Sequence, residues 1–269
     1  MEMNKVQPNV VTIFEGRNWL LHGYDIFKKQ PLVWILTLLA YWSAMFLFGL
    51  IPIVGLLVSL IISPGIAFGF ICLAKAVDQN QEVPPRIIIS GFTGSKKFDL
   101  LLLGFYYCIS LFLILVLITL LSDKSVINLV NNPDLQINSE ANSGTFFNIK
   151  IITVLILYIP IQMIFWFAPQ LVVWGNLNSI KAMFYSFFAV LLNWKSFLTY
   201  LLTWIMILIG ISIFIALLIS LFKLDQGSLL VLFLPISLLI MGIAHCSYYA
   251  STKTIFSDLV TKHSNPNPN

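Results

Sequence analysis

The sequence predicts an all-α fold, a polytopic membrane helical bundle of six transmembrane helices with interfacial amphipathic segments. Hydrophobic residues make up 59% of the 269 residues and charged residues only 10%, too few charges to cover a water-facing surface. The charged residues leave long charge-free gaps, and a helix needs roughly 20 apolar residues to cross a bilayer. These gaps are continuously apolar rather than alternating, which favours helices over barrel strands.

The gaps predict six spans, and the gap between Lys29 and Lys75 is long enough for two of them. In chain order we expect spans at 32–51, 54–75, 99–121, 150–174, 197–221 and 229–250. Residues 1–31 precede them as an N-terminal segment without the features of a cleavable signal peptide. Residues 122–148, rich in Asn and Ser, are expected to form a loose outer loop. Residues 251–269 are expected to form a flexible tail.

Lysine and arginine predict the orientation of the spans. With six spans both termini share one side, and twelve of the fifteen Lys and Arg residues fall on that side. The other three are Lys124, Lys150 and Lys223. The positive-inside rule therefore places both termini in the cytoplasm. This topology explains the net charge of +4, so we expect no nucleic-acid partner.

Amphipathic segments are predicted before the outward spans. In residues 13–29, Leu20, Tyr24 and Phe27 recur at helical spacing beside charged residues, and residues 177–194 repeat this pattern around Phe184. Residues 84–98 occupy the equivalent place before the third span. Basic amphipathic helices beside a span normally lie in the plane of the membrane surface.

Each inward span contains a proline, at Pro64, Pro169 and Pro235. Three hairpin repeats, each made of a surface segment, an outward span and an inward span, would explain this regularity. Ordinary boundary chemistry of membrane helices would explain it as well, and the sequence leaves both interpretations open.

No motif points to catalysis, a cofactor or a metal. Nucleotide-binding, metalloprotease and serine-hydrolase fingerprints do not occur. The interiors of the spans also lack Asp, Glu, Lys and Arg, which ion-coupled pumps usually need at membrane depth. Asp78 and Glu82 follow the second span, where they could pair with Lys75 or Arg86 or simply lie on a solvated loop. We therefore expect no catalytic residue, no cofactor and no metal ligand.

Two places carry candidate polar or kink residues. Gln162 stands between Pro160 and Pro169, and each proline deprives the carbonyl four residues earlier of its helical donor. Tyr158 and Gln162 are close enough to share a polar pocket, which is either helix–helix contact or a small binding site at a broken helix. His245 either hydrogen-bonds a neighbouring helix or reaches the lipid headgroups, or else it ligates haem or transfers a proton.

Several stretches resemble a family of uncharacterised multi-pass proteobacterial inner-membrane proteins. They are GYDIFKKQPLVWI (23–35), GFICLAKAVDQNQEV (69–83), YIPIQMIFWFAPQLVVW (158–174), KAMFYSFFAVLLNWKSFLTY (181–200) and CSYY (246–249). Together they cover most of the chain. The resemblance implies a bacterial inner membrane and the same six spans, and it brings no activity, ligand or catalytic residue.

Two functions follow from these observations. The first is a non-enzymatic inner-membrane bundle that acts through membrane lipids, a membrane-protein partner or a second copy of the chain. The alternative is a transporter or permease for a neutral, amphiphilic or lipid-like substrate, which the broken inward spans favour. An enzyme is not expected. A continuous cavity containing Gln162 would favour transport, and a bundle filled by side chains would count against it.

Overall fold

The computed structural model describes residues 6–121, 149–223 and 226–262, and the regular elements in these ranges are all helices. Among them, six membrane spans are long and apolar enough to cross a bilayer. They are α2 (Pro31–Gly49), α3 (Val54–Asp78), α5 (Lys97–Leu121), α7 (Ile149–Trp166) with α8 (Ala168–Val173), α10 (Trp194–Phe222) and α11 (Gln226–Ile255). The predicted all-α fold with six spans is confirmed. The expected outer loop at 122–148 lies outside the described residues.

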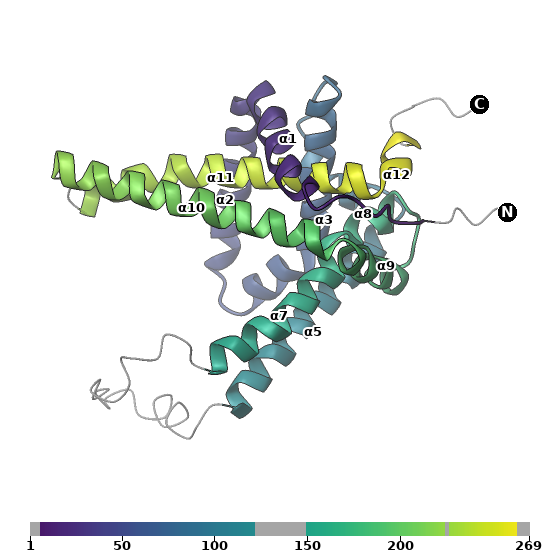
Figure 1. Ribbon diagram of the computed structural model, residues 1–269. Coiled ribbons are helices and arrows are strands. Elements are labelled where there is room, and N and C mark those ends of the chain that lie inside the picture. The colour runs from purple at the N-terminus through teal and green to yellow at the C-terminus, as the bar shows by residue number, and fades with distance from the viewer. Residues whose placement is uncertain (1–5, 122–148, 224–225, 263–269) are drawn as a thin grey trace.

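The spans form three consecutive hairpins, α2 with α3, α5 with α7, and α10 with α11. A short helical segment precedes each hairpin: α1 (Glu15–Lys29), η1 (Ile87–Ile89) with α4 (Ser90–Thr93), and α9 (Ser179–Leu192). In Figure 1 the hairpins diverge from one end of the molecule, where α9 and α12 (Ser257–Lys262) lie and where the described chain begins and ends. We call this the terminal end. This element order is the one that three hairpin repeats would produce.

The short segments join neighbouring hairpins in a ring. η1 and α4 pack on α3, α9 packs on α7 and α8, and α1 packs on α10 and α11. The second and third segments thus each contact the inward span of the hairpin before them in the chain. The first segment, α1, contacts the inward span of the last hairpin and so closes the ring. Glycines allow α1 to approach closely, because a Cβ at Gly16 would lie 2.0 Å from the Ser196 carbonyl oxygen.

The two faces of α1 differ in a way that the sequence predicted only in part. Leu20 and Phe27 are buried, as are Trp19 and Ile26, whereas Tyr24 is half exposed and points away from the bundle. The buried face follows Gly16 and Gly23, whose lack of side chains brings the helix against backbone atoms of α10 and α11. The helix is therefore part of the bundle on one side and free to meet the membrane surface on the other.

The C-terminal part differs from the flexible tail expected at 251–269, because residues up to Lys262 are helical. α11 continues to Ile255 and α12 reaches Lys262, and the side chains of Thr252, Phe256 and Val260 are buried. The polar residues after the sixth span gain partners, which removes the cost of burying them. For example, the indole Nε1 of Trp19 donates a hydrogen bond to the Thr254 hydroxyl over 2.8 Å. Residues 263–269 of the expected tail lie outside the described part.

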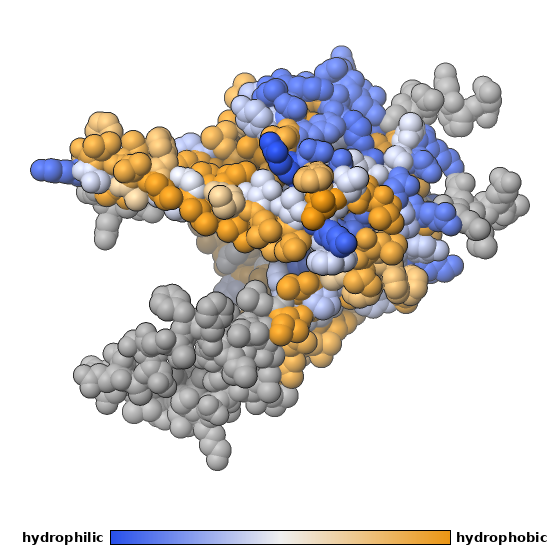
Figure 2. All heavy atoms as spheres, in the orientation of Figure 1, coloured by the Kyte–Doolittle hydropathy of each residue, from blue (hydrophilic) through white to orange (hydrophobic). Residues whose placement is uncertain are grey.

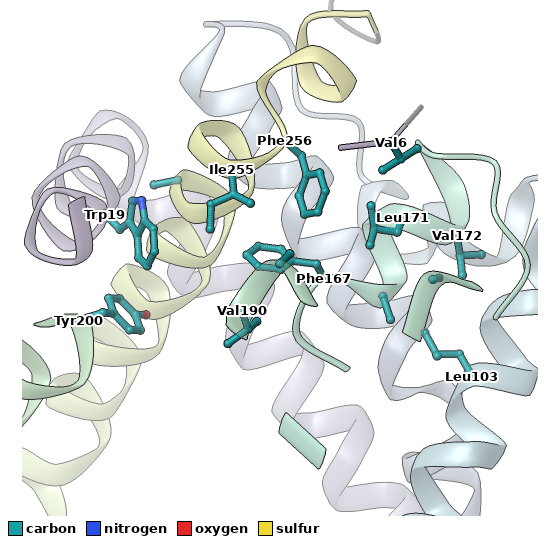
Figure 3. Close-up of a cluster of buried hydrophobic side chains, with 14 of the residues drawn as sticks. Val6, Trp19, Leu103, Phe167, Leu171, Val172, Val190, Tyr200, Ile255 and Phe256 are labelled. Atoms are coloured by element: carbon teal, nitrogen blue, oxygen red, sulfur yellow. The ribbon is translucent and has the colours of Figure 1, made fainter. Parts of the chain in front are cut away.

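The main apolar core sits at the terminal end (Figure 3). Trp19 from α1 meets Tyr200 from α10 with ring centroids 5.9 Å apart, and Phe167 meets Phe256 at 5.3 Å. By contrast, the most apolar stretch of α10 has no buried residue. Hydrophobic residues cover the outer surface of α10 and α11, and hydrophilic residues gather around α1 and α12 (Figure 2). The hairpins therefore present their outer faces to lipid.

A cluster around the Asp78 carboxylate ties α1, α3 and α11 together at the terminal end. Lys253 Nζ lies 2.7 Å from Oδ2, and His22 Nε2 lies 3.3 Å from Oδ1. Lys29 Nζ donates to the Asp78 carbonyl over 2.7 Å, and the Tyr249 hydroxyl reaches Oδ2 at 3.4 Å. The Asp78 side chain is only 10% exposed, so it does not occupy the solvated loop that the sequence suggested.

Candidate functional site: a cavity at the break in the fourth span

The fourth span is broken one residue after α7. Phe167 separates α7 from α8, with φ of −102° and ψ of −3°. Pro169 follows within the first turn of α8, where its missing N–H costs no intrahelical hydrogen bond. The break thus lies two residues before Pro169, the proline of the predicted fourth span.

Side chains from two other helices satisfy the backbone groups at the break. The Phe167 N–H donates to the Ser186 hydroxyl of α9 over 2.8 Å, and that hydroxyl donates to the Met163 carbonyl over 2.8 Å. The Tyr248 hydroxyl of α11 donates to the Trp166 carbonyl. Lipid cannot provide such partners, so the broken backbone is tolerated only because it is enclosed by protein here.

A cavity of about 530 Å³ opens beside this break, between the three hairpins. Its lining comes from all six spans, and the inward spans supply most of it. Three of the predicted candidates, Gln162, Pro169 and His245, line this one cavity. Pro64, the proline of the second span, lines it too. The structure therefore brings together residues that the sequence could only name one by one.

The other two candidates lie outside the cavity lining. Tyr158 is one turn from Gln162 toward the hairpin tip and is 39% exposed, although it remains in range of Tyr107 and Gln162. Pro160 is exposed within α7, which continues through it to Trp166. The predicted polar pocket around Gln162 thus has Tyr107 of α5 as its second wall.

Two polar groups in the lining are well placed to meet a ligand. Gln162 Nε2 lies 3.5 Å from the Tyr107 hydroxyl, at the outer limit of a hydrogen bond. His245 Nδ1 donates to the Met241 carbonyl over 2.7 Å, which leaves the other ring nitrogen, Nε2, as an acceptor. The imidazole ring rests on Phe70, with centroids 4.1 Å apart.

The rest of the wall is aromatic and aliphatic. Phe70, Phe165 and Trp166 supply flat apolar surfaces, and the Tyr200 hydroxyl is occupied by Ser247 at 2.7 Å. Among the described residues that line the cavity, there is no Asp, Glu, Lys or Arg. Small-molecule sites commonly combine such apolar walls with a few convergent polar groups.

Sequence reasoning missed several of these residues. Tyr41 and Tyr107 lie inside charge-free spans, where the sequence does not distinguish a tyrosine that faces lipid from one that faces the bundle. Ser186 belongs to a surface helix, and nothing in the sequence connects it with the break at Phe167. Mid-span tyrosines were the one available signal. In the described part of the chain, no group of three His, Cys, Asp or Glu residues gathers as a metal site requires.

Comparison with known proteins indicates which membrane contains this chain. The chain is 29% identical over 245 residues, which are 90% of either chain, to a Burkholderia thailandensis protein named "Probable inner membrane protein". The chain is an integral, multi-pass inner-membrane protein. The expected resemblance to uncharacterised multi-pass inner-membrane proteins is thereby confirmed. No family model matches the chain, and no solved structure matches it significantly.

Proposed function

We propose that this protein binds a neutral, amphiphilic or lipid-like molecule in the cavity and moves it within or across the inner membrane. The observation that carries the proposal is the 530 Å³ cavity that contains Gln162 beside a broken span. Its volume lies within the range of about 300–1,000 Å³ that small-molecule sites occupy. Broken helices that line a cavity at membrane depth are also where transporters place their substrates.

The lining indicates the chemistry of the substrate. A charged ligand would lose its hydration without gaining an ionic partner, so the uncharged lining favours a neutral one. Lipid tails are already as apolar as the cavity wall, so apolar contact alone would select no particular amphiphile. Gln162, Tyr107 and His245 would therefore decide which polar head is accepted.

A bundle that acts only through outer contacts is the second candidate, supported by the exposed apolar face of α10. Such a protein would work through membrane lipids, a membrane-protein partner or a second copy of the chain, and it would need no cavity. Both candidates are non-enzymatic. The cavity is the feature that separates them, and it favours the carrier.

The carrier proposal predicts that a molecule stays bound during purification. Protein extracted from native membranes in a mild detergent should retain a neutral amphiphile that mass spectrometry detects. Ala244→Phe fills the cavity and should abolish retention. Gln162→Leu should weaken it about fivefold, as expected for one hydrogen bond worth about 1 kcal/mol.

The matched control is Leu208→Phe on the lipid-facing side of α10, which adds the same aromatic ring away from the cavity and should change nothing. Identical extracts from the wild-type protein and from Ala244→Phe would refute the carrier proposal and leave the outer-contact bundle.

We also propose that both termini face the cytoplasm, because twelve of the fifteen Lys and Arg residues belong to the terminal side. In a variant without Cys72, Cys108 and Cys246, single cysteines at Asn138 and Ser264 should react with a membrane-impermeant thiol reagent from opposite sides. Asn138 should react in intact cells and Ser264 only after the membrane is opened. Labelling of both from one side would overturn this topology.

A further inference from the structure

A second pocket, of about 450 Å³, lies at the terminal end and is separate in its lining from the cavity. Four distant segments build it: α4, the turn into α5, the connection from α8 to α9, and α12. We call it the lysine pocket, because Lys96 and Lys262 reach it from the second and the last of these segments. Its other lining residues are small or neutral, with Trp174 as the one large aromatic wall.

Positive charge dominates the lysine pocket. Among its described lining residues are two lysines and no carboxylate. Lys96 Nζ is held between the Asp99 carboxylate and the Leu177 carbonyl, each 3.5 Å away. Asp99 therefore pairs with one of the two lysines that line the pocket.

Neutral donors surround these cations. Ser95 and Asn176 contribute a hydroxyl group and an amide group to the lining. Gly94–Lys96 form the turn that leads into α5, so this helix begins at the edge of the pocket. Ammonium groups, hydroxyl donors and a helix N-terminus together favour an anion with several acceptor oxygens.

We propose that the lysine pocket binds a phosphate-bearing anion. Its place at the terminal end, where hydrophilic and hydrophobic surfaces meet, is accessible to two sources of that chemistry. One is the phosphate of an anionic phospholipid headgroup, and the other is a free phosphorylated small molecule. The pocket is independent of the substrate cavity, so either site can exist without the other.

The test uses the full-length protein in a neutral detergent, observed by native mass spectrometry. One arm titrates phosphatidylglycerol against phosphatidylcholine, and the other titrates inorganic phosphate and glycerol 3-phosphate. The wild-type protein should bind one anion preferentially. Lys96→Gln combined with Lys262→Gln should weaken that binding about tenfold, the loss expected for charge-assisted hydrogen bonds at a partly exposed site.

Matched controls separate the lysine pocket from general charge effects. Lys28→Gln combined with Lys195→Gln removes the same charge elsewhere at the terminal end and should alter binding less than about twofold. Lys262→Gln alone changes an exposed residue of α12, so it tests the pocket even where the double variant folds poorly. Gln162→Leu, which alters the cavity, should leave anion binding unchanged.

The lipid titration and the soluble-anion titration together show which source supplies the bound phosphate. Lysine-dependent binding of phosphatidylglycerol identifies a lipid headgroup, and lysine-dependent binding of the soluble anions identifies a free ligand. Binding of neither probe, or binding that is equally sensitive to the control pair of lysines, overturns the proposal.

Discussion

The terminal end and the hairpin tips of this bundle are held together in different ways. At the terminal end, α1 closes the ring of helices, Asp78 joins α1, α3 and α11, and the aromatic core around Phe167 fills the interior. Toward the tips, Ile159 of α7 and Leu234 of α11 are about half exposed or more, although they lie in the same spans. One end is closed by contacts across the whole sequence, whereas the other relies on the surrounding membrane.

This difference explains which way the cavity opens. Tyr248 lines the cavity, and beyond it toward the terminal end Thr252 and Phe256 are buried. In the opposite direction along α7, Ile159 and Ile156 are exposed. The cavity therefore has a closed floor at the terminal end, and we expect it to open between the hairpins. A ligand that enters from the bilayer would find that opening directly.

The largest effect is expected where α1 joins the terminal end. Gly16→Leu would place a side chain against the Ser196 carbonyl oxygen and the Tyr200 backbone nitrogen, neither of which can rotate away. Displacing α1 should destabilise the protein by about 3 kcal/mol or more. The measurement is the midpoint of thermal denaturation in detergent.

Gly210→Leu is the matched control, because a Cβ at Gly210 meets no atom within 4 Å. It should leave the midpoint nearly unchanged. Equal effects of the two substitutions would mean that α1 does not pack on α10 as described.

A smaller effect is expected at the carboxylate cluster. Asp78→Asn removes the negative charge beside Lys253 and Lys29, and it should destabilise the protein by about 1–3 kcal/mol, since these two lysines then lack a counter-charge. Limited proteolysis should also show earlier release of α1.

The control is Asp25→Asn on the outer face of α1. A hydrogen bond from Lys28 lowers the pKa of the Asp25 carboxyl, but both side chains are 57% exposed, so solvent screens the pair. No measurable change in denaturation is expected. If Asp25→Asn were as damaging as Asp78→Asn, the stabilising role of the Asp78 cluster would be disproved.

The positions of the spans and the break in the fourth span could be predicted from the sequence. Which helix packs against which could not. Charge-free gaps identify membrane helices because a charge inside a bilayer is costly, and a proline limits where a helix can continue. Which face of an apolar helix meets protein is a different matter, because lipid and protein interior are about equally apolar. That is why α10, with no buried residue in its most apolar stretch, resembled the other spans in sequence.

The same reasoning explains what was missed in the surface helices and at Asp78. α9 packs against the bundle through its small residues Ala182, Ser186 and Ala189, whereas Phe184 points outward. The aromatic face of α9 is therefore the outer face of this helix. Asp78 finds Lys253, which lies far along the chain, and no local pattern predicts such a pairing. Gln162 and His245 were recognised singly, and only the fold placed them in one cavity.

The central claim is that the cavity holds a selected amphiphile, and a photo-cross-linking residue at Gln162 tests it most directly. Ile159, one turn away on the exposed face of α7, is the matched position in contact with bulk lipid. After illumination in native membranes, mass spectrometry of the adducts should show one enriched neutral amphiphile at Gln162 and ordinary membrane phospholipids at Ile159. The same phospholipid adducts at both positions, or adducts at Gln162 to protein alone, would contradict the account.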